Sequence, residues 1–220
     1  MFDFVNTFLE HPREMLLFLA MALPGRLLAI SAHEFGHAWV AYRCGDPTAK
    51  QMGRLTLNPL KHLDPIGALM MLFLGFGWAK PVPINPLNFR NYKKSMALVS
   101  LAGIITNLIL AFFAVPFFKL CAGFASSTNA GKLFLYYLTM FLILINISLA
   151  IFNLLPIYPL DGFNFINTFL KYDNKFSNFM IKYGGIILIV LVVTGAFGFA
   201  FDFVANGVLK LFLMFWGLIF

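Results

Sequence analysis

The sequence predicts an all-α polytopic membrane protein with about five or six transmembrane segments and a short re-entrant element. Of its 220 residues, 60% are hydrophobic and only 11% are charged, whereas soluble domains are about a quarter charged. The apolar residues also form long runs, such as 138–147 and 186–193, which a single soluble core of this size could not bury.

The first apolar segment covers about residues 15–42, which at about 1.5 Å per residue is enough for one crossing. Pro24, followed by glycine and arginine, is expected to interrupt it. A polar loop of residues 43–64 comes next. The following segment, 65–79, is short for a full crossing and is predicted to be re-entrant.

Segments 95–118 and 133–155 are each long enough to cross the membrane. A proline-rich break at 156–162 follows the second of them. Two last apolar segments are expected to form a transmembrane hairpin over about 183–220. No repeat or linker divides the chain, so we predict one domain over 1–220, with its core in about 15–170.

The basic residues orient the chain. Loops 43–64 and 80–94 carry four Lys or Arg residues each, and loop 171–182 carries three lysines. The positive-inside rule places all three loops in the cytoplasm and the nearly uncharged loop 121–131 outside. This topology accounts for the net charge of +7 without a nucleic-acid partner.

The first segment contains His33, Glu34 and His37 in the order HExxH. Histidines four residues apart on a helix project from one face, so both imidazoles can bind one zinc ion. The glutamate between them is placed to take a proton from a zinc-bound water. An accidental match is disfavoured because ionisable residues are costly inside an apolar segment.

A catalytic zinc requires a third protein ligand and one open position. Most of the nine acidic residues lie in polar loops or on the outer side of the predicted topology. Asp161 and Asp202 have apolar surroundings, but Asp202 falls in an outer turn. Asp161 follows the break on the cytoplasmic side, near the end of the helix that carries the histidines, and is therefore the predicted third ligand.

These motifs resemble the site-2 protease family of intramembrane zinc metalloproteases. The resemblance spans about residues 31–162 and includes the HEFGH motif and the sequence NLLPIYPLDG at 153–162. Residues 45–59 and the WAKPVP sequence at 78–83 look like the compact prokaryotic branch without PDZ or CBS domains.

The resemblance implies one zinc ion per chain, bound by His33, His37 and Asp161, with Glu34 as general base. It also implies a three-helix catalytic core built from segments 15–42, 95–118 and 133–155. The expected substrate is a transmembrane protein or peptide, cut within or near its membrane-spanning part. Such proteins lie in the lipid bilayer of the prokaryotic cell membrane, here with the active site towards the cytoplasm. The family's GPxxN pattern reads Gly103-Ile-Ile-Thr-Asn107, without the proline.

Two asparagines are candidate substrate-binding residues. Asn153 precedes the proline-rich break and is placed to stabilise the oxyanion or to orient the substrate. Asn107 is the second candidate. The alternative for both is hydrogen bonding between helices.

Residues 53–57 alternate between polar and apolar side chains, which suggests a strand in a small membrane-associated β hairpin that accepts an extended substrate. An ordinary interfacial hairpin is the alternative. His62 is interpreted either as a residue that orients Glu34 or one of the zinc ligands, or as a solvated loop residue.

Two other function classes compete with the protease. A metal or proton transporter would also contain buried ionisable residues, but internal symmetry and ligands repeated along a path are missing from the sequence. A non-catalytic metal-binding relative would be expected to lack the glutamate or a ligand. The oligomeric state and the natural substrate are not predicted.

Overall fold

The computed structural model describes residues 10, 12–73, 77–196 and 198–219. Its longer helices are α2 (Pro12–Arg43), α5 (Tyr92–Cys121), α6 (Ala130–Asn153), α8 (Lys175–Thr194) and α9 (Gly198–Gly217). The shorter ones are α3 (Thr48–Gln51), α4 (Pro65–Phe73), α7 (Asp161–Asn167) and the 3-10 turns η1 (Pro59–Lys61), η2 (Pro86–Asn88) and η3 (Ala122–Phe124).

The prediction of an all-α polytopic membrane protein is confirmed. Four of the described helices are long and apolar enough to span a membrane: α5 with η3, α6, α8 and the part of α9 from Ala200. That α2, with 32 residues, also crosses stays a prediction from the sequence. Helix α4 has nine residues and is too short to cross, as expected for the re-entrant segment, although residues 74–76 lie outside the description.

Asparagines cap the N-termini of several of these helices. The side chains of Asn91, Asn129 and Asn174 accept hydrogen bonds from the first backbone N–H groups of α5, α6 and α8. Helix α8 ends at Gly195, whose φ of 63° places it in the left-handed region. Pro24, in contrast, does not interrupt α2, which continues through it. The expected break is therefore not observed, because a proline removes only one hydrogen bond from a helix that its neighbours support.

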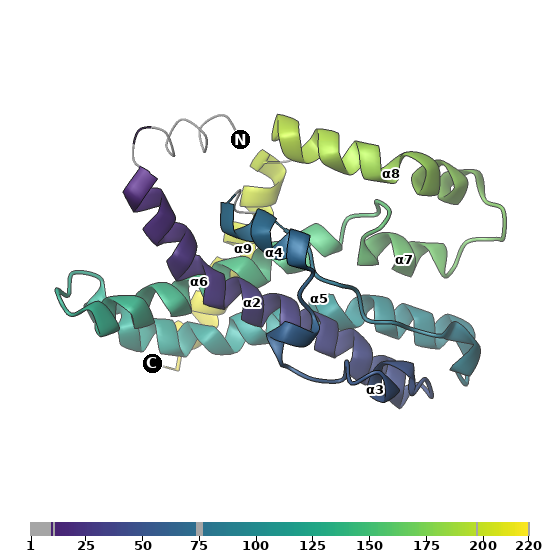
Figure 1. Cartoon of the computed structure of the whole chain (residues 1–220), viewed down its shortest axis with the longest axis horizontal. Coiled ribbons are helices and arrows are strands. Elements are labelled where there is room, and N and C mark those ends of the chain that lie inside the picture. Colours follow the sequence, from purple (N-terminus) through teal and green to yellow (C-terminus); the bar gives the residue numbers. More distant parts are fainter. Residues whose placement is uncertain (1–9, 11, 74–76, 197, 220) are drawn as a thin grey trace.

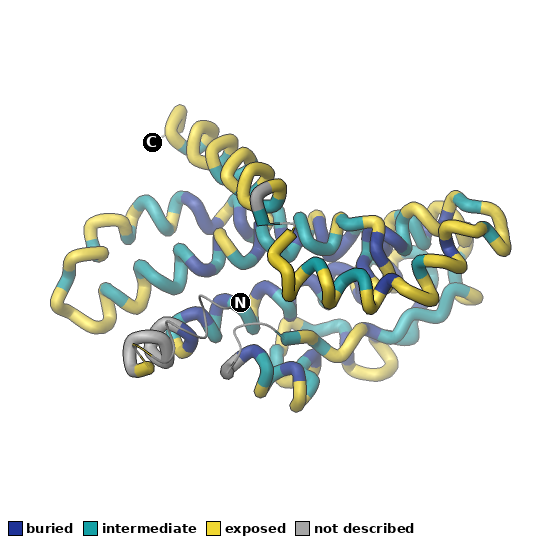
Figure 2. The backbone as a smooth tube through the Cα atoms, turned by 90° about the horizontal axis from the view of Figure 1, so that it is seen from above, coloured by how far each residue is buried: buried dark blue, intermediate teal, exposed yellow. Residues whose placement is uncertain are grey.

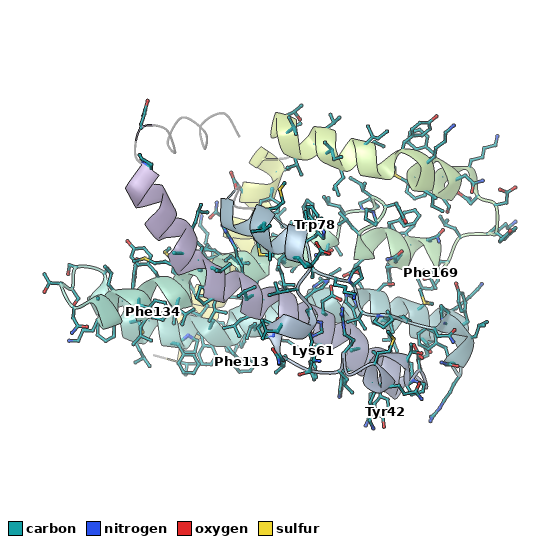
Figure 3. All side chains as sticks on the ribbon, in the orientation of Figure 1. Tyr42, Lys61, Trp78, Phe113, Phe134 and Phe169 are labelled. Atoms are coloured by element: carbon teal, nitrogen blue, oxygen red, sulfur yellow. The ribbon has the colours of Figure 1, made fainter. Side chains whose placement is uncertain are left out.

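Helices α2, α5 and α6 pack against one another and form the predicted three-helix core (Figure 1). Small residues at intervals of three or four along α2 permit this close approach: Ala22, Gly25, Ala29, Ala32 and Gly36. Buried positions gather along these three helices, whereas α8 and α9 are mostly exposed (Figure 2). Phe113 and Phe134 on the outer surface of α5 and α6 are 55% and 41% exposed, as expected for side chains that face lipid (Figure 3).

Several of the connections lie at two opposite ends of the molecule. The end of α2, the start of α5 and the α7–α8 connection are together at one end, and the α5–α6 connection is at the other (Figure 1). This arrangement agrees with the three basic loops sharing one side of the membrane.

Candidate metal centre and catalytic site

The two histidines of α2 and the first residue of α7 meet in the interior. His33 and His37 are 8% and 7% exposed, and their Nε2 atoms lie 3.0 Å apart. Asp161 Oδ2 lies 3.2 Å from each of these nitrogens. The chain reaches Asp161 through the proline-rich turn after α6, which contains a cis peptide bond between Tyr158 and Pro159.

Helix α5 sets the orientation of both imidazoles. His37 Nδ1 lies 2.7 Å from the Val99 carbonyl oxygen, and His33 Nδ1 lies 3.2 Å from Asn107 Oδ1. Because both partners are acceptors, each Nδ1 carries the proton and donates it. The Nε2 atoms therefore direct lone pairs at each other and at the carboxylate of Asp161.

This donor set fits a zinc ion. Asp161 Oδ2 is buried and has no hydrogen-bond donor among the described residues. Two lone pairs and a carboxylate oxygen at mutual distances of 3.0–3.2 Å repel one another unless a cation or a proton lies between them. Ligand atoms at about 2.0–2.1 Å from a tetrahedral zinc are about 3.3 Å apart, close to the observed separations.

Gly103 on α5 provides the space for this cluster. A Cβ atom at this position would lie closer than 3.0 Å to both histidine rings. The rings therefore pack directly on the α5 backbone. Asn107, one turn further along α5, accepts a hydrogen bond from His33 Nδ1, the ring nitrogen that does not face Asp161.

Glu34 follows His33 on α2 and, like the three ligand residues, lines a cavity at the site. Its Oε2 accepts a hydrogen bond of 2.9 Å from the backbone N–H of Val82. Val82 belongs to a segment without helix or strand, residues 80–85, that lines the site. The sequence alone offered no sign of this contact, because a backbone donor carries no side-chain signal.

Two buried side chains fix the 80–85 segment. Arg54 Nη2 donates to the carbonyl oxygens of Lys80 and Pro81, at 2.6 and 3.2 Å. Asp46, which is fully buried, accepts from the Asn85 backbone N–H at 2.7 Å. The segment is therefore anchored at both ends beside Glu34.

The charge of Asp46 contributes to this anchoring. Burial alone would raise the pKa of its carboxyl, but hydrogen bonds from Thr48, Asn88 and the Asn85 backbone outweigh burial, so the pKa lies below its ordinary value. The stabilisation is therefore present at neutral pH and is lost as the pH falls through this lowered pKa.

The cavity at the site has a volume of about 270 Å³. The three ligand residues, Glu34 and Asn153 line it, together with apolar side chains of the 80–85 segment and of α5. Asn153 donates one hydrogen bond, of 3.0 Å, to the Leu149 carbonyl oxygen. Asn107 is fully buried and contacts His33, so its position suits the support of a ligand more than contact with substrate.

Two expectations for the loop after α2 differ from the structure. Residues 53–57 form no strand, and the one β-bridge in the described part of the chain joins Leu63 to Ala79. His62 is 1% exposed and bonds the Thr56 carbonyl oxygen at 2.8 Å, so it is neither solvated nor hydrogen-bonded to Glu34. The Thr56 carbonyl oxygen, which a neighbouring strand would otherwise bond, is bonded by His62 of the same loop.

Comparisons with known proteins identify relatives of this chain. The model of peptidase family M50 matches residues 122–192, which include Asn153 and Asp161. The protein named "Putative zinc metalloprotease YwhC" from Bacillus subtilis (strain 168) is 40% identical over 194 residues, covering 86% of each chain. The "Putative zinc metalloprotease Rip2" from Mycolicibacterium smegmatis is 31% identical over 186 residues, covering 80% of this chain and 68% of its own. No solved structure is significantly similar.

Proposed function

Because this chain belongs to peptidase family M50, the site-2 protease family, we propose that it hydrolyses peptide bonds within or near transmembrane segments of other membrane proteins. The family and the membrane-spanning helices make it a membrane metalloprotease. Its proposed metal is one zinc ion per chain, held by His33, His37 and Asp161.

One observation carries the proposal. Three ligand atoms converge within 3.2 Å of one another in a cavity that also contains Glu34. A purely structural zinc site is normally closed by four protein ligands, whereas here three ligands face a cavity of about 270 Å³, which leaves the fourth position open to water.

Glu34 is the proposed general base. The chemistry that zinc supplies when bound is polarisation of the scissile carbonyl and acidification of the attacking water. Glu34 accepts the proton of that water and later gives it to the leaving amine. The Val82 N–H holds Oε2, which leaves Oε1 as the oxygen for this proton.

The two asparagines have different proposed roles. The Nδ2 group of Asn153 uses one hydrogen to bond Leu149, and its second hydrogen can bond the carbonyl oxygen of the substrate at the scissile bond. Asn107 positions His33 because its Oδ1 accepts a hydrogen bond from the Nδ1–H of His33.

We propose that the chain lies in the cell membrane with this site towards the cytoplasm. The ligands on α2 are six and ten residues before its end at Arg43, and the basic loops lie at that end. Its cellular task would be regulated intramembrane proteolysis or the clearance of membrane peptides.

Cleavage of a tagged single-span protein in detergent tests this function. The native chain is expected to cut it, and a zinc chelator is expected to stop the reaction. Glu34→Gln should bind zinc with native affinity and lose about 10²–10⁴-fold in kcat, the usual contribution of a general base. A Glu34→Gln variant that still cuts at the native rate would contradict the proposed mechanism.

A further inference from the structure

A second cavity, of about 470 Å³, lies between α2, α4, α6, α8 and α9. Apolar side chains form most of its wall, among them Ile30, Leu149 and Phe152. It adjoins the candidate active site along α6, because Phe152 lines this cavity and the next residue, Asn153, lines the other.

Arg26 is the charged residue that lines this apolar cavity. Its Nη1 donates to the Met71 carbonyl oxygen of α4 at 3.1 Å. No carboxylate of the described residues lies within ion-pair distance of it. This is the one hydrogen bond that Arg26 makes to the part of the chain that the structure describes, and a guanidinium has five N–H donors, so most of them have no partner there.

The position of Arg26 relates it to the catalytic site. It precedes His33 by seven residues on α2, which places both on one face about 10 Å apart along the axis. A charged side chain inside an apolar segment is costly and marks a functional site by default. The carbonyl of Met71 offers only a partial negative charge, so the positive charge of Arg26 is not neutralised by it.

We propose that Arg26 and this cavity form a subsite for a substrate transmembrane segment that carries an acidic side chain. The inference rests on the proposed proteolytic function and adds a specificity to it. A carboxylate in an apolar transmembrane segment is itself costly, so pairing it with Arg26 removes two unfavourable charges at once. The acidic residue lies on the side of the scissile bond away from the cytoplasm. The spacing is about three residues if the substrate is extended there and about seven if it is helical.

Matched peptides test the subsite. A single-span peptide carries Leu, Asp or Lys at each position three to seven residues from the cut. Its affinity is measured in detergent by fluorescence anisotropy, and its cleavage by kcat/KM. The native chain is expected to bind the Asp peptide about tenfold more tightly than the Leu peptide at one position, the size of one charge-assisted hydrogen bond. Arg26→Met should abolish this preference, and Arg26→Glu should reverse it towards Lys.

Lys119→Met is the matched control, because Lys119 also donates to a backbone carbonyl between helices, that of Trp216 at 3.2 Å. It should leave the Asp preference unchanged. If the native chain shows no preference at any position, or Arg26→Met weakens all peptides equally, Arg26 only anchors α4 and the inference fails. If Arg26→Met does not fold, Arg26→Gln is used, because its neutral amide can still donate to the Met71 carbonyl oxygen. A preference for Asp that persists in this variant would also overturn the proposal. Binding preference without any cleavage would instead contradict the proteolytic function and leave the subsite standing.

Discussion

At the scale of single residues, the candidate metal centre depends on a position without a side chain. A Cβ atom on Gly103 would lie closer than 3.0 Å to His33 and His37, so alanine has to displace a ring. We expect Gly103→Ala to lower zinc affinity by about 10–100-fold, the range known for losing the support of a ligand. Competition with a chromophoric chelator measures this. Helix propensity alone would make Gly103→Ala more stable than the native chain, because alanine favours a helix over glycine by about 1 kcal/mol. A loss of zinc affinity is therefore not explained by a weaker helix.

Gly185→Ala is the matched control on α8, where an added Cβ would meet no atom within 4 Å. Its zinc affinity should equal that of the native chain. Equal zinc affinity in both variants would show that His33 and His37 do not form the ligand pair at this position.

The same residues show how far sequence reasoning reaches. The spacing of His33 and His37 determines that they share a helix face, so their meeting was predictable from the sequence, and elimination among nine acids pointed to Asp161. The support that Asn107 gives to His33 was not predictable. It depends on which face of α5 meets α2, and an amide in a membrane helix suits substrate binding and helix pairing equally.

At the scale of elements, the 80–85 segment is the part of the site with the least regular structure. Arg54 satisfies two of its carbonyl groups, and its Val82 N–H binds Glu34. We expect Arg54→Met to release the segment and lower kcat by about tenfold, a part of the 10²–10⁴ that a general base supplies. Zinc content should stay native, because Arg54 contacts none of the ligands.

Steady-state cleavage with zinc analysis separates this effect from general destabilisation. Arg54→Lys should restore part of kcat, since it keeps one donor, and Arg90→Met, an exposed arginine in the next loop, should change nothing. A drop in zinc content that parallels the loss of kcat would mean that Arg54 supports the fold and not Glu34.

Elements were predictable to different degrees for a physical reason. Apolar runs specify the long helices through local interactions, so α5 and α6 agree with the expected segments. Helix α8 begins at Lys175, inside the loop expected at 171–182, because the side chain of Asn174 caps it there. The missing strand at 53–57 and the unbroken helix at Pro24 depend on partners distant in sequence. The alternation at 53–57 covers only five residues, too few to predict a strand, and the segment that contacts Glu34 is instead 80–85.

At the scale of the whole molecule, the proposed hydrolysis requires water, so the side of the membrane that the site faces decides where that water comes from. The ligands lie in the last part of α2 and at the start of α7. The end of α2 is at one end of the molecule, and the nearly uncharged α5–α6 connection is at the other (Figure 1). The positive-inside rule assigns the first end to the cytoplasm. Two native cysteines report on both ends, because Cys44 follows α2 and Cys121 ends α5, and both are free and partly exposed.

We expect a membrane-impermeant maleimide to label Cys121 in right-side-out vesicles of Cys44→Ser, and Cys44 only in inverted vesicles of Cys121→Ser. Labelling in denaturing detergent gives the full extent for each variant and corrects for partial burial. The reverse pattern would turn the site to the outside and exclude cytoplasmic water as the reactant. Labelling of both cysteines from one side would mean that α5 does not cross the membrane. Its 30 residues and its apolar sequence predict that it does cross.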